Sequence, residues 1–83
     1  MIVSRKDVIA TLEDRLAGRI SDGALAAWAF DLFYRVEQGQ ATVPPEDADA
    51  IAEALDAMMF ADDPGFALAE ADLRRLIDRL QQP

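Results

Sequence analysis

The stretch from residue 24 to residue 38 constrains the fold of this chain more than any other, because it is apolar over most of the circumference of a helix. One face has apolar residues at the spacing i, i+3, i+4, i+7, i+8 and i+11: Leu25, Trp28, Ala29, Leu32, Phe33 and Val36. A second apolar strip beside this face contains Phe30 and Tyr34. Such a helix needs neighbours on more than one side, so the sequence predicts that it is the central helix of a small bundle.

Capping and stopping residues bound this helix and three further segments of helical spacing. Ser4 and Ser21 are predicted N-caps, and Asp7 follows Ser4 by three residues, as in a capping box. Gly18 and Gly39 are predicted to end the first two helices. The predicted helices cover residues 5–17, 22–38, 45–61 and 69–81.

These segments predict one all-α domain that spans residues 1–83. The alternation of period two that marks a strand is confined to the brief stretch 66–69. Short connections favour helices that pack antiparallel to their neighbours. The expected fold is therefore a compact four-helix bundle with short connections. The expected buried face of its third helix consists of Ala48, Ile51, Ala52, Leu55, Met58 and Met59.

The charge of the chain is strongly negative and unevenly distributed. The chain has sixteen acidic and eight basic residues, which gives a net charge of −8. Between Arg35 and Arg74 there is no lysine or arginine, while the same interval contains ten acidic residues. Such a surface repels nucleic acid and anionic membranes and attracts basic proteins. The alternative is that the acidic residues serve only solubility.

The residues that usually carry catalysis or bind metals are scarce. The chain has no histidine and no cysteine, which excludes thiolate sites and the Glu-x-x-His pairs of di-iron bundles. The turn at residues 62–65 lacks the ligand spacing of a calcium loop. We therefore expect no enzymatic activity, cofactor or metal site. The absence of a signal peptide or a membrane-spanning apolar run leads us to expect a soluble cytoplasmic protein.

The third predicted helix has a feature that folding alone does not require. Glu46, Asp49, Glu53 and Asp56 recur at i, i+3, i+7 and i+10, and no basic residue is interleaved with them. Phe60 continues the same side of the helix beyond Asp56. Two interpretations of Phe60 stay open: it is an exposed aromatic anchor, or it folds under the following turn and packs on another ring.

The pattern favours a protein-binding surface, with charges that steer a basic partner and an aromatic residue that anchors it. The candidate partner-binding residues are Glu46, Asp49, Glu53, Asp56, Phe60, Asp62 and Asp63. The alternative is a structural or oligomerising bundle, or an accessory subunit, with a merely solubilising acidic surface. In that case Phe30 and Tyr34 would form the interface of a homodimer.

The outline of the chain resembles small bacterial immunity proteins of the colicin D type. The resemblance lies in the segment Leu12-Glu-Asp-Arg-Leu-Ala-Gly-Arg-Ile-Ser21, in the aromatic helix that follows it, and in the closing Ala69-Glu-Ala-Asp-Leu73. It implies a compact acidic helical protein that covers the basic active site of a transfer-RNA-cleaving toxin with carboxylates that stand in for phosphates. The resemblance transfers no inhibitory residue position by position.

Overall fold

The computed structural model of the protein describes residues 1–82. Within them the chain forms four α-helices with short connections and one 3-10 turn, η1, that leads into the third helix. The elements are α1 (Arg5–Leu16), α2 (Asp22–Glu37), η1 (Pro45–Asp47), α3 (Ala48–Met59) and α4 (Glu70–Gln81). The predicted all-α four-helix bundle is confirmed, and the helices end within one or two residues of their predicted bounds. The start of α3 is the exception, because η1 occupies its first three predicted residues.

The predicted helix signals act as expected at four helix ends. Ser4 and Asp7 form a capping box: the Asp7 N–H donates to Ser4 Oγ at 3.2 Å, and the Ser4 N–H donates to Asp7 Oδ2 at 3.0 Å. Ser21 Oγ accepts from the N–H of Ala24 at 3.1 Å. Gly18 and Gly39 follow the ends of α1 and α2 with φ of 76° and 75°, the left-handed conformation that glycine adopts most readily.

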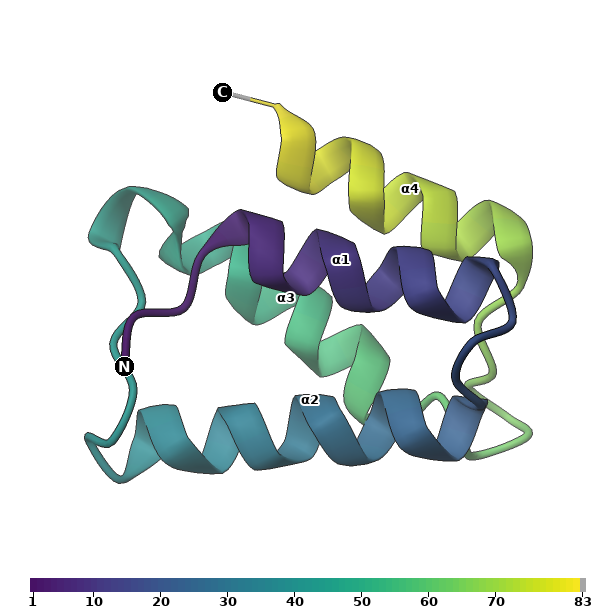
Figure 1. Cartoon of the computed structure of the whole chain (residues 1–83), viewed down its shortest axis with the longest axis horizontal. Helices are drawn as coiled ribbons and strands as arrows, with labels where there is room; N and C mark the ends of the chain where they lie inside the picture. The colour runs from purple at the N-terminus through teal and green to yellow at the C-terminus, as the bar shows by residue number, and fades with distance from the viewer. Residues whose placement is uncertain (83) are drawn as a thin grey trace.

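Helices that follow one another along the chain run in roughly opposite directions, as the short connections predicted (Figure 1). Figure 1 shows α2 along one edge of the molecule and α4 along the opposite edge, with α1 and the diagonal α3 between them. α2 packs on α3 and α1, while α4 packs on α1 and α3. The middle of the bundle is therefore formed by α1 and α3.

The core is aliphatic. Its largest fully buried side chains are Leu12, Leu25, Ile51, Met58, Leu80, Val3 and Val8. All six aromatic residues lie outside this fully buried set, and only Trp28 among them is even partly buried against it. Aliphatic residues and alanines thus fill the interior, while the rings remain near the surface.

The prediction that residues 24–38 form the central helix is wrong. α2 lies at an edge, and its second apolar strip faces outward: Phe30 is 46% exposed and Tyr34 is 54% exposed. Phe33, which was expected on the buried face, is 40% exposed. The physical reason is that α3 and α1 both pack on the same face of α2, where Leu25, Ala26, Ala29 and Leu32 are buried, and no helix within residues 1–82 covers the opposite face.

The buried face of α3 also differs from the prediction. Ala50 and Ala54 are buried, while Ala52 is exposed and Ala48 is only partly buried. Ile51, Leu55 and Met58 are buried as predicted, so the difference lies in which alanines accompany them. Alanine gives no clear signal in such a pattern, because its single methyl group suits both the core and the surface.

Residues before α1 add a contact that the periodicity did not predict. The Val3 N–H donates to the carbonyl of Thr42 at 2.9 Å, and the Thr42 N–H donates to the carbonyl of Met1 at 2.8 Å. This isolated bridge joins the start of the chain to the loop between α2 and α3. It positions Val3, which is fully buried, in the core.

Candidate functional site

The four acidic residues predicted to share one side of the third helix lie close together in the structure. Asp49, Glu53 and Asp56 are on α3, and Glu46 is in η1 directly before it. At 100° of rotation per residue, the three residues on α3 fall within about 60° of its circumference. All four side chains belong to exposed residues. We call this set the acidic row.

The opposite face of α3 explains why the acidic row points outward. Ile51, Ala54 and Met58 are at most 1% exposed, so they fix the rotation of the helix about its axis. A carboxylate turned into that aliphatic interior would lose its hydration without a compensating partner. Core packing therefore holds the acidic row on the surface.

One member of the acidic row is paired and the others are not. Arg79 of α4 donates to Glu53 Oε2 at 3.4 Å, between side chains that are 48% and 60% exposed. A pair this exposed contributes no more than about 1 kcal/mol. Within residues 1–82, Glu46, Asp49 and Asp56 have no basic group within 4.0 Å. The row thus keeps three uncompensated carboxylates.

Phe60 packs on another aromatic ring and is also exposed, so each of the two interpretations left open by the sequence is partly correct. Its ring packs on Phe66, with centroids 6.0 Å apart and the planes inclined by 50°. Phe60 nevertheless remains 47% exposed, and Phe66 is 65% exposed. The two rings and Asp56 line one surface hollow of about 360 Å³. An aromatic pair therefore stands beside the last carboxylate of the acidic row.

The two acidic residues of the following turn have different surroundings. Asp63 Oδ1 accepts from the N–H of Gly65 at 2.8 Å, so this side chain stabilises the turn. Asp62 is exposed and lines another hollow together with Phe30 and Phe60. The structure therefore places Asp62 between the end of α3 and the outward face of α2.

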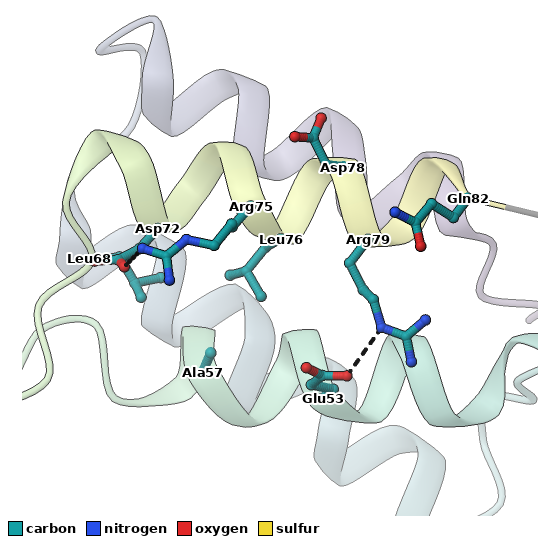
Figure 2. Close-up of a pocket in the computed structure, with 9 residues that line it drawn as sticks. All are labelled: Glu53, Ala57, Leu68, Asp72, Arg75, Leu76, Asp78, Arg79 and Gln82. Carbon is teal, nitrogen blue, oxygen red and sulfur yellow. Dashed lines mark hydrogen bonds and ion pairs between the residues drawn. The ribbon is translucent and has the colours of Figure 1, made fainter.

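A groove between α3 and α4 lies along the acidic row, and sequence patterns did not predict it. It encloses about 580 Å³, with Ala57, Leu68 and Leu76 among its lining residues. Figure 2 shows Arg79 reaching down toward Glu53 across the groove, while Asp78 points away from α3. Ala57 and Leu68 also line the hollow beside Phe60, so the two concave surfaces are continuous.

The three arginines of α4 differ in the position of their acidic partners. Arg74 pairs with Glu70 at 2.8 Å and Arg75 with Asp72 at 3.0 Å, at the helical spacings that the sequence contains. Arg79 pairs with Glu53 on another helix instead of with a residue of its own helix. Because Arg79 and Glu53 are 26 positions apart in the sequence, helical spacing does not predict this pair.

The serine hydroxyls and the carboxylates of the described residues have the following surroundings. Both serine hydroxyls of the chain accept helix-capping hydrogen bonds. Within residues 1–82, no three carboxylates converge where a metal ion could bind. In the same residues, every helix is too short or too polar to cross a bilayer.

The fold and this surface define a class: a small all-α bundle with an exposed acidic row and exposed aromatic rings. The chain matches no protein-family model, and no curated protein or solved structure is significantly similar to it.

Proposed function

We propose that this protein is a binding module for a basic protein partner, which docks on the acidic row of α3. The observation that carries the proposal is the combination of three uncompensated carboxylates with an exposed aromatic pair at the end of the row. Solubility explains exposed charge, but it does not explain why Phe60 and Phe66 are exposed beside that charge.

Electrostatics and apolar contact would act at different stages of binding. Carboxylates on a rigid helix raise the encounter rate with a cationic surface, and salt screens this effect. Aromatic side chains that become buried on docking slow dissociation, since they are the residues that most often dominate interface energetics. Strong salt dependence of association is therefore expected.

The specific form of this proposal is an inhibitor that occupies the basic active site of a nuclease toxin. It rests on the resemblance to immunity proteins and on the charge. A nuclease groove that binds phosphates also accepts carboxylates at the spacing of one or two helical turns. In this form the protein would abolish RNA cleavage at equimolar concentration.

A second candidate is a homodimer through Phe30 and Tyr34. The observation that favours it is the exposure of both rings, which pack on each other with centroids 5.9 Å apart. In this case the acidic row would serve solubility alone. Sedimentation velocity across a range of protein concentrations distinguishes a stable dimer from a monomer.

The test of the proposed function is capture of basic proteins from the source cells, followed by titration of each purified candidate. Asp49→Lys combined with Asp56→Lys is the informative variant, because neither carboxylate takes part in an ion pair within the described residues. Loss of about 100-fold or more in affinity is expected, with a steep salt dependence for the unsubstituted protein.

The matched control is Glu13→Lys combined with Asp14→Lys. Both residues are on α1, outside the hollows beside the acidic row, and Asp14 would lose only an exposed ion pair with Arg19. Each double variant changes the net charge from −8 to −4. The control should retain most of the affinity. Equal losses in both variants would show that net charge alone drives binding, and equal affinity in all three proteins would remove the acidic row from the interface.

A further inference from the structure

Three of the seven exposed large hydrophobic residues in the described part of the chain lie on α2. On the side of α2 that adjoins α3 lie Phe30 and Phe33, which are 46% and 40% exposed. Tyr34, which is 54% exposed, extends this surface because its ring packs on Phe30 with centroids 5.9 Å apart. From α3 come Ala52, which is exposed, and Met59, which is partly buried. We call this surface the α2–α3 seam.

Two hollows lie along the seam, one toward each end. The first, of about 320 Å³, is lined by Ala27, Phe30 and Met59 among others. The second, of about 190 Å³, includes Phe33 and Ala52 in its lining. The residues of α2 that line them are centred roughly nine residues apart, which is about 13 Å at 1.5 Å per residue.

That distance suits a helix as the occupant. Apolar side chains seven or eight residues apart on an incoming helix are separated by about 11 to 12 Å along its axis. Anchors at i, i+3, i+4 and i+7 are how an amphipathic helix fills a groove between two helices. The seam runs beside α2, whose 16 residues give it a length of about 24 Å.

The charges on the seam point to a cationic occupant. The first hollow includes Asp62 and the second includes Glu37, and neither includes a lysine or arginine from the described residues. Asp49 and Asp56 of the acidic row lie on the outward face of α3, next to Ala52 in rotation about the helix axis. The groove between α3 and α4 differs, because Arg75 and Arg79 both line it.

A second copy of the chain fits this surface poorly. A two-fold dimer would place the seam of one molecule against the seam of the other. The acidic residues on each rim would then approach those of the partner, between two chains of net charge −8 each. A basic helix would instead satisfy the same carboxylates.

We infer that the α2–α3 seam receives an amphipathic helix of a basic partner, with apolar anchors in the two hollows and cationic side chains against the acidic row. This inference rests on the proposed function, because it names the part of the basic partner that is bound. It adds Phe30, Phe33 and Tyr34 to the interface.

The probe is a synthetic peptide of about 18 residues, with leucine at i, i+3, i+4 and i+7 and lysine at the other positions. A peptide of the same composition, permuted so that the leucines share no helical face, is its control. Fluorescence anisotropy should show the amphipathic peptide binding at least about 10-fold more tightly than the permuted one. Equal affinity for both peptides overturns the inference.

The decisive variant is Phe30→Ser combined with Tyr34→Ser. Its matched control is Ile2→Ser, since Ile2 is also exposed, at 72%, but lies before α1 and lines none of these hollows. The double variant should lose about 10- to 100-fold in affinity for the amphipathic peptide, and the control should stay within about 3-fold. Circular dichroism establishes that each variant remains folded.

The failures of the two proposals are distinguishable. If Asp49→Lys with Asp56→Lys weakens binding while Phe30→Ser with Tyr34→Ser does not, the acidic row binds but the seam does not, and the inference falls alone. If Phe66→Ser, a variant in the hollow beside Phe60, causes the larger loss, the helix occupies the groove between α3 and α4 instead. A concentration-dependent dimer at low salt, abolished by Phe30→Ser with Tyr34→Ser, assigns the seam to a second copy and also overturns the inference.

Discussion

At the residue scale, Arg5 makes the contacts that tie together the most distant parts of the chain. Its Nε donates to Asp47 Oδ1 at 2.6 Å, and its Nη1 donates to the carbonyls of Leu80, at 2.9 Å, and Gln82. The Arg5 and Asp47 side chains are only 22% and 23% exposed. The Arg5 guanidinium therefore links the start of α1 to η1, and it donates to carbonyls at the C-terminal end of α4.

Replacing Arg5 with methionine should lower the free energy of unfolding by about 1 to 3 kcal/mol, because it leaves a partly buried carboxylate and two carbonyls without their donor. For a domain of this size, each kcal/mol corresponds to roughly 4 to 8 °C in Tm. Thermal and urea unfolding measure the change. Arg35→Met is the control, since the Arg35–Asp31 pair is exposed and should contribute about 0.5 kcal/mol or less. Similar losses in both variants would contradict the role given to Arg5.

Gly39, like Gly18, is a residue at which backbone conformation alone decides what can be substituted. Its φ is +75°, and the N–H of Gln40 after it donates to the carbonyl of Arg35 at 2.8 Å, which closes the end of α2. A Cβ added at Gly39 would meet no atom within 4 Å. The cost of a side chain there is therefore conformational and not steric.

Gly39→Ala should destabilise the protein by about 1 to 2 kcal/mol, while Gly23→Ala should stabilise it by up to roughly 1 kcal/mol. Gly23 lies in the first turn of α2, and a Cβ there meets only Ser21 Oγ at an ordinary 3.8 Å. Urea unfolding of both variants gives the comparison. A loss of stability at Gly23, or none at Gly39, would be inconsistent with the observed backbone.

At the element scale, capping and stopping residues predicted the helix ends more accurately than apolar periodicity predicted the packing of the helices. Ser4, Ser21, Gly18 and Gly39 each act within a few residues of their own position, so the sequence located the helix ends well. The place of α2 at the edge depends on which of its two apolar strips meets another helix. The periodicity of α2 identified the buried face, which contains Leu25, Ala29 and Leu32. It did not show that no further helix covers the second strip, because that depends on the other helices.

The buried and the exposed apolar strip of α2 should contribute unequally to the stability of the protein. Leu32 is 3% exposed, and Leu32→Ala should cost about 2 to 5 kcal/mol. Phe30→Ser combined with Tyr34→Ser should change the free energy of unfolding by only about 1 kcal/mol or less, because both side chains are half-exposed. A large loss in the double variant would mean that the strip contributes to the core.

At the scale of the whole molecule, the acidic row was predictable and the concave surfaces beside it were not. Spacings of three and four residues place Asp49, Glu53 and Asp56 on one side of a helix wherever that helix packs. The groove between α3 and α4 depends on how closely the two helices approach, and the small side chain of Ala57 leaves space there. Pairing between Arg79 and Glu53 likewise follows from tertiary packing.

The acidic row lies between two other surface features of the molecule. α1 lies on the side of Figure 1 nearer to the viewer, and α3 lies behind it, with α2 and α4 at the edges. The acidic row on the outward face of α3 is thus flanked by the apolar α2–α3 seam and by the groove toward α4. Charge and exposed apolar area coincide on this side.

The most direct test of this account is a backbone amide NMR titration of the intact protein with the amphipathic leucine–lysine peptide. We predict that shift changes concentrate at residues 49–62 of α3 and its following turn and at residues 27–37 of α2. Amides near Glu13, Asp14 and Asp78, which are acidic residues of α1 and α4, should change little. Shift changes spread evenly over all acidic residues, or concentrated on α1, would contradict the claim that the acidic row of α3 is the binding surface.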